Sequence, residues 1–148
     1  MNRENDIVLS SDNLSKSMNF RTTKMENLDK ENFIKYRLFE MFFYLGVPSY
    51  LNGFNYLVSG ICQSCDNIAL LSEITKELYP RLAVEFKTNE SCIEQSIRHV
   101  IKVLWAKGNI LELERIFGIR AKKRPSNSEF ISMFTDKLLF EYKMYNIK

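Results

Sequence analysis

Polar and charged side chains recur along residues 91–105 at positions that one face of a helix would share. An α-helix advances by about 100° per residue, so the apolar residues of this stretch form a single narrow stripe. Those residues lie at positions 93, 97, 100, 101, 104 and 105. The opposite face carries Ser91, Cys92, Gln95, Arg98, His99 and Lys102. Arginine and glutamine are side chains that bond base edges, so this face predicts contact with a DNA groove.

A second helical pattern, from Pro80 to Phe86, precedes this stretch, and a tight polar turn separates the two. The order predicts a helix-turn-helix over about residues 80–107, with the second helix as the recognition helix. Thr88 or Asn89 could cap that helix, and so could Ser91 in a capping box with Glu94. For Glu94, the capping role and a base contact are equally supported.

The remaining pattern predicts an all-α fold of about six helices. A dense apolar helix from Phe33 ends at Gly46 and Pro48, and another runs from Gly53 to Cys65. A third helix should begin after Asp66 or Asn67 and continue to Leu78. Shorter helical patterns cover 111–117, and a capping box at 126–129 opens the last helix. The aromatic residues are expected in the core, namely Phe33, Phe42, Phe43, Phe54, Phe86, Trp105, Phe117, Phe130 and Phe134.

The 148 residues suit one folded domain and a tail, and 45% hydrophobic content is typical of a chain with a real core. Residues 1–30 are polar and lack a sustained apolar period, which predicts a flexible arm before a domain at 31–148.

The net charge of +3 permits nucleic-acid binding. The chain shows no signal peptide and no apolar run long enough for a membrane span, so we expect a cytoplasmic protein without membrane contact.

Metal and enzyme chemistry are less favoured by the sequence. Cys62 and Cys65 stand in a helical stretch, and only Cys92 and His99 could complete a set of four zinc ligands. Small buried side chains are the simpler interpretation of the two cysteines. No glycine-rich phosphate loop and no nucleophile–base pair is evident, so the sequence predicts no cofactor, no metal and no enzymatic activity.

From Gly46 onward the sequence resembles the DNA-binding effector domain of the stage-zero sporulation master response regulator of Firmicutes. The matching motifs run in order and with near-constant spacing. They include Gly46-Val47-Pro48, Ile74-Thr75-Lys76, Leu78-Tyr79-Pro80, Ile97-Arg98-His99, Trp105, Gly108-Asn109-Ile110, Phe117-Gly118 and Asn127-Ser128-Glu129-Phe130-Ile131. The resemblance implies an all-helical domain that binds short boxes of double-stranded DNA and contacts RNA polymerase sigma factor. A receiver domain precedes this module in the family, and the segment before it here is too short for one.

The resemblance also implies roles for individual residues. Glu94, Arg98 and His99 match the family's recognition helix, whereas the family has arginines at the positions of Cys92 and Gln95. We therefore expect a less guanine-dependent box, since arginine–guanine pairs contribute about 1–3 kcal/mol of discrimination each. The expected base-contacting residues are Ser91, Cys92, Glu94, Gln95 and Arg98. The expected phosphate-contacting residues are Lys87, His99 and Lys102.

A basic cluster follows the recognition helix. Its loop residues are Arg120, Lys122, Lys123 and Arg124. Cations so close together are typical of a solvated loop, and equally of a loop that contacts phosphates. In the family this region lies near the surface that meets sigma factor, although here the loop is shorter and more basic.

An alternative function is that of an interaction protein. An effector domain of this kind could form a homodimer, or a heterodimer with a full-length relative that it antagonises. The helix from Phe33 and the last helix, from Phe130 to Tyr142, would supply the apolar contact surface.

Overall fold

The computed structural model describes the backbone of residues 11–147 and the side chains of residue 27 and residues 29–147. The chain divides between Phe33 and Ile34 into two units, so the start of α1 (Ser11–Leu45) belongs to the first. The end of α1 and all later elements belong to the second. These are α2 (Asn52–Asp66), η2 (Ile68–Ser72), η3 (Ile74–Leu78), α3 (Tyr79–Glu85), α4 (Glu90–Lys107), α5 (Ile110–Phe117) and α6 (Asn127–Ile147). The described part is helical and contains no strand, which confirms the all-α prediction.

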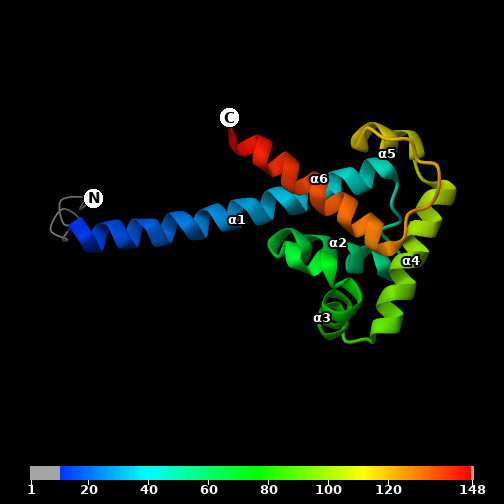
Figure 1. Ribbon diagram of the computed structural model, residues 1–148, viewed down its shortest axis with the longest axis horizontal. Coiled ribbons are helices and arrows are strands. Elements are labelled where there is room, and N and C mark those ends of the chain that lie inside the picture. Colours follow the sequence, from blue (N-terminus) through cyan, green and yellow to red (C-terminus); the bar gives the residue numbers. More distant parts are fainter. Residues whose placement is uncertain (1–10, 148) are drawn as a thin grey trace. The chain divides into compact units, whose positions relative to one another are not determined.

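Helix α2 is the central element of the second unit, because it contacts both α4 and α6. Figure 1 shows α3 beside the start of α4 and α5 beside its end. An aromatic cluster joins the other helices: the ring of Phe42 in α1 lies 5.6 Å from that of Phe54 in α2 and 5.2 Å from that of Phe134 in α6. Phe117 of α5 lies 5.0 Å from Phe134. This core fixes the frame on which α4 is mounted.

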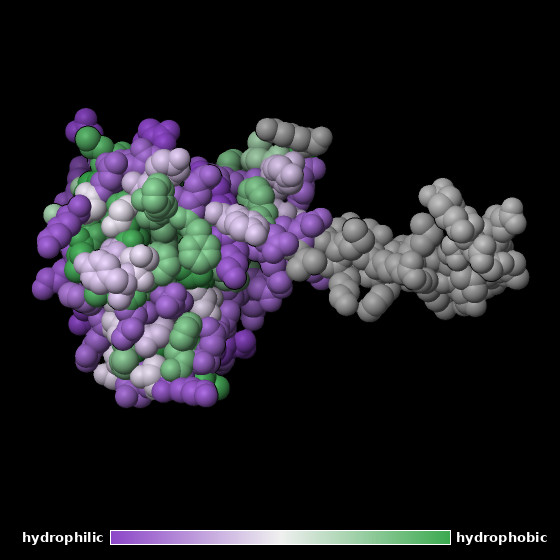
Figure 2. Space-filling model, turned by 180° about the vertical axis from the view of Figure 1, so that it is seen from behind, coloured by the Kyte–Doolittle hydropathy of each residue, from purple (hydrophilic) through white to green (hydrophobic). Residues whose placement is uncertain are grey.

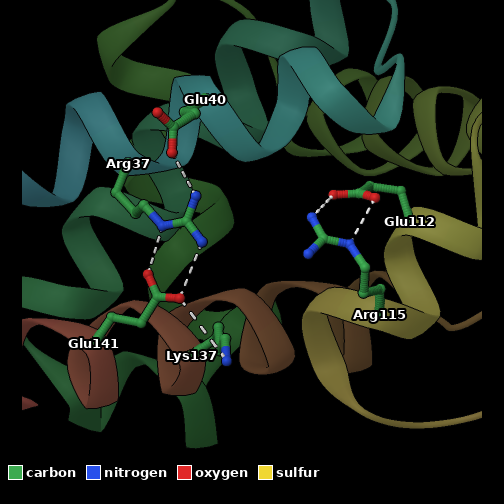
Figure 3. Close-up of polar contacts among 6 residues, drawn as sticks. All are labelled: Arg37, Glu40, Glu112, Arg115, Lys137 and Glu141. Atoms are coloured by element: carbon green, nitrogen blue, oxygen red, sulfur yellow. Dashed lines mark hydrogen bonds and ion pairs between the residues drawn. The ribbon is translucent and has the colours of Figure 1, made fainter.

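An ion-pair network adds a polar link between α1 and α6 at the edge of the core (Figure 3). The Arg37 guanidinium donates through Nε and Nη2 to the two carboxylate oxygens of Glu141, at 2.6 and 3.0 Å. It also bonds Glu40 one turn away, and Lys137 approaches Glu141 at 3.8 Å. Hydrogen bonding to Glu141 raises the pKa of Arg37. An arginine that makes two hydrogen bonds to one carboxylate fixes the relative orientation of the two side chains as well as contributing energy.

The last helix begins as the sequence predicts. The Ser126 hydroxyl accepts from the Glu129 N–H at 3.1 Å, and the Glu129 carboxylate accepts from the Ser126 N–H at 3.4 Å. These reciprocal bonds form a capping box and satisfy two backbone donors at the helix start. The box sets where α6 begins, and therefore where the basic loop ends.

The structure differs from the sequence-based expectations in two elements. Helix α1 begins at Ser11, about twenty residues before the start that apolar periodicity indicated, because a polar segment without helix breakers can still be helical. Between Asp66 and Tyr79 the single expected helix is instead a 3₁₀ turn and a π turn. They are separated at Glu73, whose φ of −136° is outside the helical range.

The expectation for the aromatic residues is only partly met. Phe42, Phe54, Phe130 and Phe134 are buried, as predicted. Phe33, Phe86, Trp105 and Phe117 are half-buried. Phe43 contradicts the prediction, since its side chain is 80% exposed. It follows the buried Phe42 directly, and neighbouring residues of a helix point about 100° apart.

Candidate nucleic-acid interface

Two helices and a short turn make up the predicted recognition element. The α3 helix ends at Glu85, and Thr88 N donates to the Ala83 carbonyl at 2.9 Å to close the turn. Lys87 takes a left-handed conformation there, with φ of 53°. Asn89 caps α4, because its side-chain oxygen accepts from Cys92 N at 2.8 Å. Of the caps that the sequence allowed, Asn89 is therefore the one used, and Glu94 is not part of a capping box.

One side of α4 is anchored in the core. Its buried residues are Ile93, Ile97, Val100, Ile101 and Leu104. Trp105, which we expected among the anchors, is only half-buried and borders a surface hollow. The start of α2 reaches the middle of α4 at Gly53, where any added Cβ would overlap the Ser96 carbonyl. The close approach of two backbones fixes the orientation of α4 about its own axis.

The other side of α4 is open to solvent, as the sequence predicted. Its exposed residues are Ser91, Gln95, Arg98, His99 and Lys102, and Lys87 of the preceding turn is exposed as well. Cys92 and Glu94 are half-buried at its edges. The Gln95 amide donates to the Ser91 hydroxyl at 3.2 Å. The exposed face thus presents a guanidinium, an amide, an imidazole and two ammonium groups, the side-chain types that bind bases and phosphates.

Glu94 and Arg98 form an ion pair on this face. Arg98 Nη2 bonds the Glu94 carboxylate one helical turn earlier, and the two side chains are 64% and 31% exposed, respectively. A glutamate four residues before an arginine is the favourable orientation on a helix, so the spacing alone signals this pair. The carboxylate holds the guanidinium near the first turns of α4. Exposed pairs of this kind are weak, which leaves Arg98 able to exchange its partner for a base or phosphate.

Cys92 has a polar environment at the first turn of α4. Hydrogen bonding to Thr88 lowers the pKa of the Cys92 thiol, and bonds to Ser96 and Tyr56 act in the same direction. The Cys92 sulfur lies 3.8 Å from the Ser96 hydroxyl. The Cys92 thiol therefore loses its proton more readily than an ordinary cysteine.

The basic loop borders the same surface as Arg98. A groove of about 430 Å³ is lined by Arg98 of α4, by Lys123 and Arg124 of the loop, and by the first residues of α6. Arg120 and Lys122 instead line a smaller hollow of about 220 Å³ beside Trp105, which Lys123 also borders. All four loop cations are exposed. The fold thus brings Lys123 and Arg124 next to Arg98, whereas Arg120 and Lys122, earlier in the loop, lie beside Trp105 near the end of α4.

Asn127 positions this groove, a role that its place in the sequence did not predict. Its amide nitrogen donates to the Glu94 carbonyl of α4 at 3.0 Å and to the Tyr79 hydroxyl of α3 at 3.1 Å. Burial raises the pKa of Tyr79, and the bond from Asn127 opposes that rise. One amide therefore ties the start of α6 to both helices of the recognition element. The family motif at 127–131 includes Asn127, but the motif does not reveal its bonds, since its partners are distant in sequence.

A second hollow lies on the other flank of α4. It measures about 250 Å³ and is lined by Gln95, Ser96 and His99 together with residues 51–53 at the start of α2. His99 therefore faces the flank of the helix, the side on which a phosphate contact was expected. Arg115 lies outside all these surfaces and bonds Glu112 within α5, where it lowers the pKa of the Glu112 carboxyl (Figure 3).

An all-helical domain with an anchored helix and an exposed basic face is typical of helical DNA-binding domains. The family model for "Sporulation initiation factor Spo0A C terminal" matches residues 38–138, and the chain belongs to this family. It is a family of DNA-binding effector domains of response regulators that act in transcription and sporulation, and not a family of enzymes. The matched range contains α2 to α5 and most of α6, whereas the first 27 residues of α1 precede it.

The described histidine, cysteine and carboxylate side chains form no group of three or more that could hold a metal ion. Within the same residues, none of the helices has the length and apolar character needed to cross a bilayer.

Proposed function

We propose that this chain is a sequence-specific transcription regulator that inserts α4 into the major groove of double-stranded DNA. The observation that carries the proposal is the two-sidedness of α4. Ile93, Ile97 and Leu104 hold one side in the core, while Gln95, Arg98 and Lys102 are exposed on the other. A recognition helix needs both properties, because it must be rigidly mounted and must reach base edges.

Base reading is assigned to the N-terminal half of the exposed face. Arg98 can bond guanine through two donors, and Gln95 can bond adenine through a donor and an acceptor. Ser91 and Glu94 stand beside them on the first turns, and Cys92 can offer a thymine-methyl contact. With Arg98 as the only arginine on the exposed face of α4, we infer a box that depends less on guanine than the boxes of the family.

Phosphate contacts are assigned to the flanks. Lys87 precedes α4, His99 borders the hollow at α2, and Lys102 lies farther along the helix. Lys123 and Arg124 extend the positive surface across the groove beside Arg98, and Arg120 and Lys122 continue it along the loop. Such contacts position a protein on the duplex without reading sequence.

The experiment compares Arg98→Ala with Arg98→Lys on the best site selected from a random DNA pool. Arg98→Ala should weaken specific binding by about 5–150-fold, equivalent to the roughly 1–3 kcal/mol of one bidentate contact. Arg98→Lys should lose most of the same discrimination but keep non-specific affinity, because lysine retains the charge and lacks the planar fork. Both variants should fold normally, since the Arg98 side chain is 64% exposed. Unchanged affinity in both would overturn the assignment of α4.

A second candidate is an interaction protein that pairs with and antagonises a full-length relative. The last part of α6 favours it, because Phe140 and Ile147 are 58% and 71% exposed there. In a promoter-binding assay with such a relative, competition by a chain that has no DNA affinity of its own would support this candidate. Intrinsic, Arg98-dependent binding would support the first. The same assay with RNA polymerase would test the contact with sigma factor that membership of the family suggests.

A further inference from the structure

The basic loop between α5 and α6 covers residues 118–126, and Figure 1 shows it running beside α4. Its cations are exposed, namely Arg120, Lys122, Lys123 and Arg124. Hydrophilic side chains cover much of the second unit in Figure 2, so exposure and charge alone do not set this loop apart. Its distinguishing feature is a fixed backbone, because hydrogen bonds hold the chain on both sides of residues 122–124.

Glu114 of α5 holds the first end of the basic run. Its backbone carbonyl accepts from the N–H groups of Gly118 and Ile119, at 2.8 and 3.3 Å, and so closes the end of the helix. Gly118 has a φ of 66°, the left-handed conformation with which glycine commonly ends a helix. The Glu114 carboxylate accepts from the Ala121 N–H at 2.7 Å, seven residues further on. Glu114 therefore fixes the chain immediately before Lys122.

Pro125 and Asn127 hold the second end. The two bonds of the Asn127 amide attach the first residue of α6 to α4 and to α3. Proline fixes its own φ at about −65° and restricts the residue before it, so Pro125 also limits the conformations of Arg124. The capping box of α6 follows directly. Residues 122–124 thus lie between two fixed points of the backbone.

We propose that this loop is a preformed contact for the DNA backbone, with Glu114 and Asn127 as its positioning residues. The inference rests on the proposed function and deepens it, since it assigns how the loop takes part in DNA binding. A flexible loop would lose conformational freedom when it binds phosphates, and that loss would weaken binding. A loop already fixed beside Arg98 avoids this loss. Lys123 and Arg124 then contact the backbone next to the bases that Arg98 reads.

The first test measures the loop without DNA. Trypsin cleaves after lysine, and the bond after Lys122 lies between the two held ends, whereas the bond after Lys102 lies within α4. Glu114→Ala and Asn127→Ala should each raise cleavage after Lys122 several-fold relative to cleavage after Lys102. Glu114→Gln is the matched control, because its amide oxygen can still accept from the Ala121 N–H. A variant that merely destabilises the whole fold would raise both cleavage rates together.

The second test measures affinity for the selected DNA site. Glu114→Ala and Glu114→Gln remove the same negative charge, so charge alone predicts equal affinity for the two variants. We expect Glu114→Ala to bind about 5–30-fold more weakly than Glu114→Gln, which is the cost of ordering about one backbone residue on binding. Asn127→Ala should weaken binding relative to the parent chain by a similar factor.

Unchanged cleavage in both alanine variants would overturn the proposal, and so would equally fast cleavage of Glu114→Ala and Glu114→Gln. Faster cleavage without weaker DNA binding would also overturn it, because the fixed backbone would then contribute nothing to affinity. If Arg98→Ala still weakens binding in that case, the proposed function stands and only the role of the loop is lost. A parent chain that does not bind DNA would overturn both proposals.

Discussion

At the scale of single residues, Cys92 offers a chemical probe of the recognition helix. Its thiol has a pKa below the ordinary value because it is hydrogen-bonded by Thr88, and more weakly by Ser96 and Tyr56. A lowered pKa gives more thiolate at any pH below the ordinary value. The thiolate is the reactive form of cysteine. Cys92 should therefore be alkylated at lower pH than a free thiol.

The measurement is the pH dependence of alkylation at each cysteine, read by peptide mass spectrometry. Cys62, half-buried in α2, is the internal reference. Removing the strongest bond with Thr88→Val should shift the Cys92 profile to higher pH and leave that of Cys62 in place. Adding the selected DNA site should protect Cys92 and not Cys62. Equal labelling with and without bound DNA would argue against the placement of the first turn of α4 at the duplex.

At the scale of elements, the close approach of α2 to α4 decides how the recognition helix is presented. An alanine at Gly53 would bring Cβ against the Ser96 carbonyl and within 2.6 Å of Val100 Cγ2. The backbone cannot yield cheaply there, so Gly53→Ala should destabilise the fold by about 1–3 kcal/mol. The midpoint of thermal or urea unfolding measures this change.

Gly60 provides the matched control in the same helix. A Cβ at Gly60 would meet Leu82 Cδ1 at 3.4 Å, an ordinary contact distance. Because alanine favours a helix interior over glycine by up to about 1 kcal/mol, Gly60→Ala should leave stability unchanged or raise it. Equal losses in the two variants would show that the tight approach at Gly53 is not what makes that position sensitive.

At the scale of the whole molecule, DNA binding should depend on charges that are far apart in sequence. The net charge is only +3, so affinity must come from the local gathering of cations around α4 and the loop. Each phosphate contact contributes about 0.9 to the slope of log affinity against log salt concentration. Arg124→Gln, which removes a cation from the groove shared with Arg98, should lower that slope by about 0.9.

The control for charge alone is Lys143→Gln, in the last part of α6 and outside the groove lining. It changes the net charge by the same amount and should leave the salt slope unaltered. A titration at several salt concentrations separates the two variants. Equal slopes for Arg124→Gln and the parent chain would remove the loop from the proposed interface.

The sequence by itself determined the local features of this protein. The apolar spacing of Ile93, Ile97 and Ile101 set which side of α4 is buried, because helical periodicity is a property of the chain. The capping box at Ser126 and Glu129 was equally readable, since both partners lie within one turn. The family motifs were sufficient to predict the family that the comparison then showed.

Only the tertiary structure decided what depends on long-range packing. The bonds of Asn127 to α3 and α4, and the groove shared by Arg98 and Arg124, join residues that no local pattern connects. The exposure of Phe43 belongs to the same class, because the sequence predicted both Phe42 and Phe43 in the core, whereas the packing of α1 buries Phe42 and leaves Phe43 exposed. Spacing fixes the face of a helix on which a side chain lies, whereas the neighbours of that face are fixed by the fold.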